Sequence, residues 1–452
     1  MRQTLYHIDN DLFGIPLIGP EGSNYGFGLL LALVAVLGVG FLLYRIRQTG
    51  FDAEARNNLI VLLIVCGGIV LVAPHLLAKA PDSGKLGLPI RGYGVMLLLA
   101  VVSAVLVAMR RAKQVGLHPD VILSLAMWIF VFGIIGARLL YIVRNLDDFQ
   151  GRPFGEIVSG TLNVTKGGLV VYGGLLGGAV GFLIFSLKNK IKLLPFADII
   201  AASLVLGQAI GRLGCLMNGC CYGGVCDLPV TAVTFPWESP PNIHQVHYHE
   251  TDLFGMWFET ESDGQGVKIR EVIPDSAATV AGMQPGERIL GIDGVLVDHY
   301  PELAQIMIEA VAAKEKELSL LVAGTSGETS PRILTIPSEL PRSQPVYPTQ
   351  IYGFINGTLF FFFAWVLFPF RRRDGEVFAT LLLLFPITRF LMEVIRTDEP
   401  QSFFLGMTIS QTISVLLSLS GVALWVYLSR QPKGNLAGPE TWQPINARFV
   451  SE

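Results

Sequence analysis

Residues 92–113 read GYGVMLLLAVVSAVLVAMRRAK, an apolar run that ends in a cluster of basic side chains. A helix needs about 20 apolar residues to cross the hydrocarbon core of a bilayer, and this stretch is long enough. Basic side chains gather on the cytoplasmic side of such helices. The stretch therefore predicts a transmembrane helix that ends in the cytoplasm.

The whole composition agrees with this local pattern. Of 452 residues, 51% are hydrophobic and only 15% are charged, whereas soluble domains carry about 25% charged residues. The net charge of −3 provides no basic surface for nucleic acid. We therefore predict an α-helical polytopic membrane protein and expect no nucleic-acid partner.

Apolar stretches of spanning length recur along the chain and predict about nine transmembrane helices. Two of them, 194–213 and 376–396, carry charged residues within or beside them. The expected spans are 25–44, 58–78, 92–109, 120–143, 167–187, 194–213, 350–370, 376–396 and 406–428.

Basic residues follow every odd-numbered span, which orients the chain. The residues are Arg45 and Arg47, Arg110 and Arg111, Lys188 and Lys190, Arg371 to Arg373, and Arg430 with Lys433. We expect the N-terminus and residues 214–349 outside the membrane, and the C-terminus in the cytoplasm. Residues 1–24 lack the apolar segment of a cleavable signal peptide, so the first span is expected to be a retained anchor.

One block in the middle of the chain has a different composition. Residues 250–342 hold 23 charged residues in 93 positions, against 46 in the other 359. Within the block, short β-like runs alternate with turn signals and one helical segment. The predicted elements are strands at Val267–Val272, Arg288–Ile292, Leu318–Val322 and Ile333–Ile336, a tight turn at 291–294, and a helix at Leu303–Ala313.

The stretch from Val272 to Leu290, with a short helix starting near Ser276, resembles a PDZ domain. The resemblance implies a small α+β domain that binds an extended peptide at a sheet edge. The carboxylate-binding loop would lie around Phe254–Trp257, before the first strand. The alternative is a structural insertion with no ligand.

Charged residues in the eighth expected span are the most informative, because ionisable groups at membrane depth are costly and usually functional. Arg389, Glu393 and Arg396 are four and three residues apart, so they share one helix face. Arg212 lies at the outer end of its own span. Arginine binds phosphate in a bidentate manner, so these residues indicate a polar site for an anionic lipid headgroup. The alternative is a salt bridge at a helix end.

Six stretches in order resemble the motifs of the prolipoprotein diacylglyceryl transferase family. They are Ile90–Gly94, Gly136–Tyr141, Gly167–Gly174, Gly207–Gly223, Tyr347–Tyr352 and Arg389–Arg396. The resemblance covers about 88–215 and 345–430. It implies an inner-membrane enzyme that transfers the diacylglyceryl group of phosphatidylglycerol to the lipobox cysteine of prolipoproteins, and releases glycerol phosphate.

The resemblance also implies roles for individual residues. Arg212 would contact the lipid phosphate, Arg389 would stabilise the departing phosphate, and Glu393 would orient Arg389 or assist proton removal. Tyr172, where the family has His or Tyr, joins Arg389 and Glu393 as a catalytic residue. The positions assigned to substrate binding are Arg212, Tyr93, Arg138, Asn218, Gly223, Gln350 and Arg396.

The sequence departs from the family pattern at Cys215 and Cys220, where the family usually has Asn and Glu, and at Tyr347, where it has His. Cys215, Cys220, Cys221 and Cys226 cluster there. Three interpretations stay open: disulfides (for instance Cys221 with Cys226) or inert thiols, a metal site drawing also on His244, His247 and His249, and a nucleophilic thiol at Cys220. The spacing matches no standard zinc module, so we expect no metal and no cofactor.

The expected organisation has five parts: an extension with two spans at 1–85, transferase core at 86–250 and 343–430, the PDZ-like insertion at 251–342, and a cytoplasmic tail at 431–452. The favoured function is the transferase acting on phosphatidylglycerol and prolipoprotein signal peptides. The alternative is a catalytically altered homologue that docks proteins through the PDZ-like domain. A transporter is disfavoured, because no paired broken helices stand out.

Overall fold

A computed structural model describes residues 4–9, 17–18, 24–25, 28–51, 53–72, 78–79, 86–145, 170–227, 231–237, 239–259, 266–397, 405–434 and 436–451. It divides into two compact units, each treated by itself below. The N-terminal unit holds residues 2–207, 364–378 and 430–452, and the central unit holds 208–363 and 379–429.

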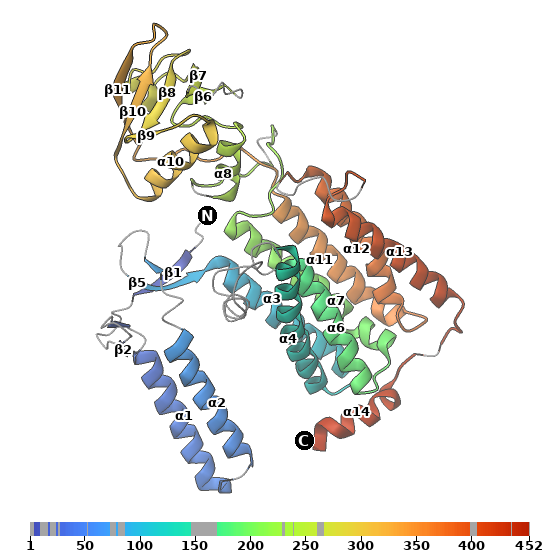
Figure 1. The fold of residues 1–452 in the computed structure, drawn as a ribbon. Helices are drawn as coiled ribbons and strands as arrows, with labels where there is room; N and C mark the ends of the chain where they lie inside the picture. The colour runs from blue at the N-terminus through green and yellow to red at the C-terminus, as the bar shows by residue number, and fades with distance from the viewer. Residues whose placement is uncertain are drawn as a thin grey trace. The chain divides into compact units, whose positions relative to one another are not determined.

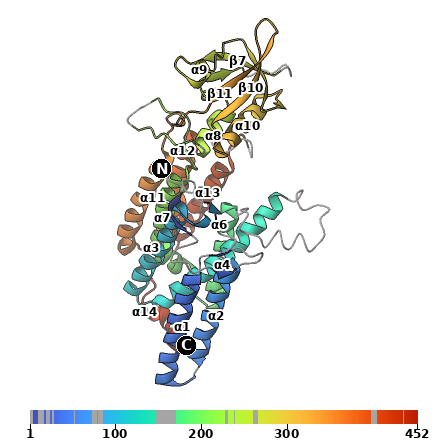
Figure 2. The ribbon, with the colours of Figure 1, turned by 90° about the vertical axis from the view of Figure 1, so that its left-hand side faces the viewer.

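The N-terminal unit begins with short strands and a helical hairpin. The strands are β1 (Thr4–Asp9), β2 (Leu17–Ile18), β3 (Asn24–Tyr25), β4 (Ala78–Lys79) and β5 (Leu86–Arg91). Strand β5 pairs with β1 and β4, and β2 pairs with β3. Helices α1 (Gly28–Thr49) and α2 (Ala53–Val72) lie side by side in both views (Figures 1 and 2). Gly50, which follows α1, has a φ of 80° and so provides the left-handed residue that ends many helices.

Four more helices follow: α3 (Gly92–Gln114), α4 (Pro119–Arg144), α6 (Val171–Lys188) and α7 (Leu193–Asn218). Helix α4 begins with a proline, whose missing N–H needs no partner in the first turn. His118 caps that turn by accepting a hydrogen bond from the backbone N–H of Asp120 at 3.4 Å. Helix α7 is continuous across the boundary between the two units.

Glycines bring α4 and α6 into backbone contact. A Cβ placed on Gly136 would lie 2.4 Å from the carbonyl oxygen of Gly173, and one on Gly177 would overlap the carbonyl oxygen of Phe132. No side chain larger than hydrogen fits at these positions. Small residues let membrane helices approach closely, so dispersion contacts between backbones hold this pair together.

A polar network joins the loop after η6 (Phe368–Phe370) to α7. Asp198 is 1% exposed and accepts backbone hydrogen bonds from Gly375 at 2.7 Å and Phe378 at 2.8 Å. The Arg371 Nε lies 3.8 Å from an Asp198 carboxylate oxygen. A buried carboxylate is stable only when it is paired and hydrogen-bonded, as it is here.

The C-terminal segment forms helix α14 (Pro439–Ser451) instead of an irregular tail. Asn446 donates a side-chain hydrogen bond to the Gly116 carbonyl at 2.8 Å and accepts one from the His118 backbone at 2.9 Å. Helix α14 thus packs at the turn between α3 and α4.

In the described residues, eight helices are long and apolar enough to cross a membrane. The expected second span, 58–78, lies partly outside those residues. Its residues 58–72 fall within α2, which includes the apolar stretch Asn58–Ile69, and Ala78 lies in β4. The chain is thus mostly helical and polytopic, and the count of nine spans stays a prediction.

The central unit contains α13 (Ile409–Ser429) and most of α11 (Thr349–Leu367) and α12 (Glu376–Ile395). Asn356 of α11 donates to the Thr388 hydroxyl of α12 at 3.0 Å. Ser418 of α13 donates to the Leu383 carbonyl of α12 at 3.3 Å. Helix α12 therefore lies between its two neighbours, as Figure 1 shows.

The inserted block folds into an α+β domain together with residues just before its expected limits, because Val246 packs in the same hydrophobic core. Its elements are α8 (Pro240–His247), β6 (Met256–Phe258), β7 (Val267–Val272), α9 (Ala277–Val280), β8 (Arg288–Ile292), β9 (Val295–Leu296), α10 (Tyr300–Ala312), β10 (Glu317–Ala323) and β11 (Thr329–Thr335). The sheet order is β11-β10-β8-β7-β6, with β9 paired to β8. The predicted strands correspond to β7, β8, β10 and β11, the predicted helix to α10 and the predicted turn to the link between β8 and β9, although β11 begins and ends earlier than expected. The short helix expected near Ser276 is α9, and Ser276 is its N-cap.

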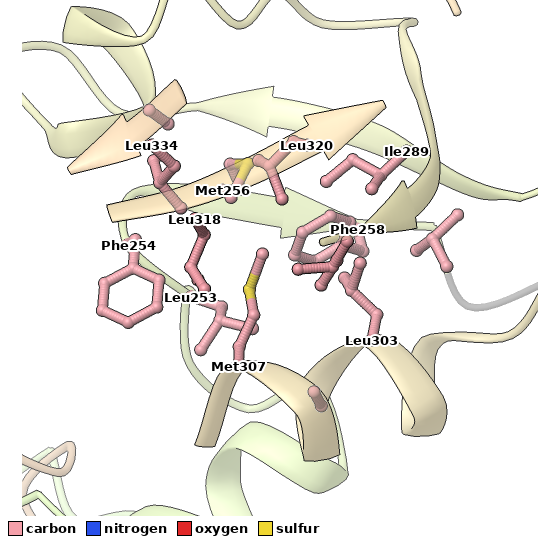
Figure 3. Close-up of a cluster of buried hydrophobic side chains, with 14 of the residues drawn as sticks. Leu253, Phe254, Met256, Phe258, Ile289, Leu303, Met307, Leu318, Leu320 and Leu334 are labelled. Atoms are coloured by element: carbon pink, nitrogen blue, oxygen red, sulfur yellow. The ribbon is translucent and has the colours of Figure 1, made fainter. Parts of the chain in front are cut away.

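One side of the sheet packs against α10. Figure 3 shows Leu303 and Met307 projecting from α10 toward Leu318 and Leu320 of β10, and all four are fully buried. Side chains along β10 alternate between buried and exposed, as expected for a strand with one face in a core. This hydrophobic core is separate from the membrane helices.

The expected carboxylate-binding loop is shorter than predicted, because β6 already begins at Met256. Phe254 and Gly255 remain as a turn with φ values of 56° and 90°. A Cβ on Gly255 would overlap the Ser276 side chain, so glycine is required here for both space and backbone conformation.

Candidate functional site

Near the end of α12, Arg389 and Glu393 form a cluster with Arg396, which directly follows the helix, in the central unit. The Glu393 side chain is fully buried and accepts hydrogen bonds from Arg389 and, at 3.0 Å, from Arg396. Arg389 also donates to the Ser410 hydroxyl of α13 at 3.1 Å. The spacing predicted a shared helix face, and these contacts confirm it. A carboxylate between two guanidinium groups fixes both of them in position.

The turn that follows α7, residues 219–224, contains the end of the 207–223 motif and is called the signature turn below. Its backbone contacts the end of this cluster. Gly223 forms a β-bridge with Arg396 and donates its N–H to the Tyr347 carbonyl at 2.9 Å. A Cβ on Gly223 would lie 2.7 Å from the Tyr347 Cβ, which is too close for any larger residue. Gly224 donates to the Ile395 carbonyl at 3.0 Å. The turn is therefore held between the segment before α11 and the end of α12.

The first residues of α11 hold the other side of that turn. Gln350 is fully buried and donates its Nε2 to the Cys220 carbonyl at 2.8 Å. The Thr349 hydroxyl donates to the Cys221 carbonyl. Three motifs that are far apart in the sequence, at 207–223, 347–352 and 389–396, thus meet in one place.

Arg212 lies against α11 in the same unit. A Cβ on Gly353 would lie 3.1 Å from the Arg212 Cδ and Cγ, so the stem of the arginine occupies the space beside this glycine. Arg212 and Arg396 both act electrostatically on the Cys221 thiol. The site is therefore electropositive, with two of its cations close to one turn.

None of the five cysteines forms a disulfide in the structure, so the Cys221–Cys226 pairing considered as one interpretation is not formed. The sulfurs of Cys215, Cys220 and Cys221 lie within 4.8 Å of one another. Cys226 is buried and has its sulfur 3.9 Å from the Thr231 hydroxyl. Only three of the four clustered cysteines therefore share a site.

The pKa of the Cys221 thiol is lowered. The largest causes are hydrogen bonds from Cys215 and Cys220, and the charges of Arg212 and Arg396 add to them. A thiolate at Cys221 is thus favoured, as it is for thiols near basic side chains in general. The Asn218 side chain, at the end of α7, is hydrogen-bonded to Cys220.

Three expected site residues belong to the N-terminal unit. Tyr93 lies in the first turn of α3 and is 40% exposed. Arg138 of α4 is buried with its guanidinium 4.9 Å from the ring centroid of Tyr141. Tyr172 lies in the first turn of α6. The same unit has an apolar cavity of about 310 Å³, lined by α3, α4 and α7 and containing none of these three residues.

Two contacts in the site were not predicted. Thr349 lies within the Tyr347–Tyr352 motif, but its hydrogen bond to the Cys221 carbonyl has no sequence signature. Ser410 starts a generic apolar helix, and nothing nearby in the sequence marks it as the partner of Arg389.

Comparison with known proteins agrees with this arrangement. Residues 82–427 match the family model for prolipoprotein diacylglyceryl transferase. A phosphatidylglycerol–prolipoprotein diacylglyceryl transferase from Rhodopirellula baltica is 30% identical over 457 residues, covering 94% of this chain and 89% of the relative.

Two shorter relatives carry the same name. The one from Clostridium tetani is 34% identical over 173 residues, covering 38% of this chain and 66% of the relative. The one from Thermosynechococcus vestitus is 34% identical over 170 residues, covering 37% of this chain and 62% of the relative. The match thus spans just under two thirds of these two proteins. With the family model covering most of its length, the chain belongs to the prolipoprotein diacylglyceryl transferase family.

Proposed function

We propose that the chain transfers the diacylglyceryl group of phosphatidylglycerol to the thiol of a lipobox cysteine in a prolipoprotein. The observation that carries the proposal is the buried Arg389–Glu393–Arg396 cluster, met by the signature turn next to Arg212. The relatives' printed names support the same activity.

The proposed reaction forms a bond between the acceptor sulfur and a glycerol carbon, and breaks the bond from that carbon to a phosphate oxygen. Glycerol phosphate leaves as an anion, and the thiol proton passes to a base. Arg212 and Arg396 bind the lipid phosphate, and Arg389 stabilises the charge that develops on the leaving group. Donors fixed in advance lower the barrier because they need no reorganisation during reaction.

Glu393 acts mainly by positioning in this proposal. Its carboxylate already accepts hydrogen bonds from Arg389 and Arg396, so its charge is used to hold the two guanidinium groups. Glu393 and Tyr172 are the two proposed acceptors of the thiol proton. The case for Tyr172 is weaker, because a phenol has a pKa near 10 and is a poor base at neutral pH. Tyr93, Arg138, Asn218, Gly223 and Gln350 are proposed to shape the lipid and peptide sites.

We further propose that the inserted domain is PDZ-like and takes an extended peptide. Strand β6 is the last strand of its sheet, so it offers backbone groups for strand addition. The turn before it, with left-handed Phe254 and Gly255, closes on itself, because the N–H groups of Gly255 and Met256 donate to Asp252 and to the Leu253 carbonyl. A prolipoprotein segment is the ligand that fits the activity of the rest of the chain.

The proposed setting is a bacterial inner membrane, with the N-terminus and the inserted domain outside and the C-terminus in the cytoplasm. Nine spans are proposed, with limits 1–85 for the extension, 86–250 and 343–430 for the transferase core, 251–342 for the insertion, and 431–452 for the tail. The basic residues after each odd span support this orientation.

The test uses the full chain in detergent with phosphatidylglycerol and a lipobox peptide, and mass spectrometry to detect the thioether product. Product is expected from the natural chain, and Arg389→Ala should lower its rate at least 100-fold, since removing one preorganised donor costs about 10²–10³-fold. Arg430→Ala, an exposed arginine beyond α13, is the matched control and should act normally.

Absence of product from the natural chain, under conditions in which a standard family member is active, would refute the transferase. Capture of a prolipoprotein peptide by the same inactive chain would then favour the docking function. Loss of that capture on deleting 251–342 would assign the docking to the inserted domain.

A further inference from the structure

The thiols of Cys215, Cys220 and Cys221 converge from two segments of backbone. Cys215 lies in the last turn of α7, and the chain then turns at Gly219, which has a φ of 77°. Cys221 has a φ of 59°, an unusual value for a residue with a side chain. This conformation brings the third sulfur back to the other two, and all three lie within 4.8 Å of one another.

We propose that these three thiols bind a soft, thiophilic metal ion, with zinc as the reference ion. Zinc binds thiolates at about 2.3 Å in tetrahedral geometry, which holds sulfurs about 3.8 Å apart. The observed spread therefore needs side-chain adjustments of only about 1 Å. Three protein ligands are also the number that leaves one position of a tetrahedral zinc ion open.

The surrounding charges suit such a complex. Three thiolates and one divalent cation carry a net charge of −1. Two arginines lie close by along the chain: Arg212 is one helical turn before Cys215 on α7, and Arg396 forms a β-bridge with Gly223, two residues after Cys221. Their positive charge suits a complex of net charge −1.

A second observation comes from Gln350. This side chain is fully buried, and its Nε2 donates to the Cys220 carbonyl at 2.8 Å. Its Oε1 has no hydrogen-bond partner among the described residues. A buried acceptor without a partner costs about 1–3 kcal/mol. The Gln350 Oε1 belongs to the same amide group whose nitrogen donates to the Cys220 carbonyl. A water molecule bound to the metal would donate a hydrogen bond to this oxygen.

A disulfide explains the cluster less well. A disulfide joins two sulfurs and leaves the third unpaired, whereas all three sulfurs here lie within 4.8 Å of one another. Cys226, which is nearby in sequence, does not take part and contacts Thr231 instead. The grouping is thus selective for three thiols, which is a ligand set and not a set of pairs.

The experiment measures metal in the full chain, purified in detergent without chelator and supplied with zinc. Elemental analysis should find about one zinc per chain, and replacing it with cobalt should give a thiolate-to-cobalt charge-transfer band. Cys215→Ser, Cys220→Ser and Cys221→Ser should each lower the zinc content at least tenfold. Cys226→Ser and Cys66→Ser, which change thiols outside the cluster, should keep it.

A measurement on the natural chain covers the case in which a variant fails to fold. Bound zinc should protect Cys215, Cys220 and Cys221 from iodoacetamide, and a chelator should expose all three together. Zinc content that stays low after reconstitution, or that survives all three substitutions, would overturn the proposal. So would a mass showing two thiols lost to a disulfide. No lipid substrate is present, so the outcome is independent of the transferase assay.

Discussion

Replacing Glu393 with alanine is the sharpest test of how the site is held together. The carboxylate is fully buried and is the acceptor for Arg389 and Arg396. Removing one partner of a buried ion pair costs about 3–5 kcal/mol, because the remaining charges have no compensation. Two guanidinium groups are left here, so the upper end of that range is expected.

The effect on catalysis follows from position. Among the described residues, Arg389 then keeps its hydrogen bond to Ser410 at 3.1 Å, which alone does not fix the guanidinium in the site. A displacement of about 1 Å at a reacting group can lower a rate about 100-fold. We therefore expect Glu393→Ala to reduce the transfer rate about 100-fold and to lower the melting temperature in detergent.

The assay compares initial rates of thioether formation with thermal unfolding followed by tryptophan fluorescence. Glu393→Gln keeps an acceptor without the charge and should recover part of the rate. Glu328→Ala, which removes an exposed carboxylate in the inserted domain, should change neither quantity. A Glu393→Ala protein with the natural rate would refute the argument that this carboxylate positions Arg389.

Three further predictions concern backbone space, titration and the core of the inserted domain. Gly223→Ala should lower the transfer rate at least tenfold, since the added Cβ would lie 2.7 Å from the Tyr347 Cβ. Gly211→Ala is the control and should be active, because a Cβ there meets nothing within 4 Å. Burial lowers the pKa of His249, so protonating this side chain opposes folding. The stability measured by thermal unfolding should therefore fall as the pH drops below about 6.5. A His249→Phe variant that shows the same fall would contradict this. Met307→Ala should destabilise the inserted domain by about 2–5 kcal/mol, seen as faster limited proteolysis within it, while the exposed Leu296→Ala should not.

The membrane helices were predictable because their signal is local. Each apolar run is long enough by itself, so no knowledge of distant partners is needed. The strands of the inserted domain were predictable for a similar reason, since each has its own pattern and turn residues. Val267–Val272 and Arg288–Ile292 have the predicted limits.

The short strands at the N-terminus were not predicted, because they depend on pairing. Strand β1 lies opposite β5, and the two are separated by the whole helical hairpin. Strands of two residues, such as β4, have no periodicity that a sequence can show. Helix α14 was missed for a different reason: its amphipathic sequence is short and contains Pro444.

The candidate site was predictable in part. The spacing of Arg389, Glu393 and Arg396 encodes their contacts directly, because residues three and four apart are neighbours on a helix. The convergence of the cysteines was not readable, because it depends on the left-handed conformation of Cys221. A left-handed conformation at a residue other than glycine has no sequence signature, so the sequence left a shared metal as only one of three interpretations.

The glycine contact between α4 and α6 reverses the usual idea of a conservative substitution. Changing Gly136 or Gly173 to alanine keeps the hydropathy of the span and improves its helix propensity. Yet the added methyl group would enter the backbone of the facing helix. Natural sequences should therefore vary more on the lipid-facing side of these helices, even between residues of very different volume. They should vary least at the glycines where the two backbones are in contact.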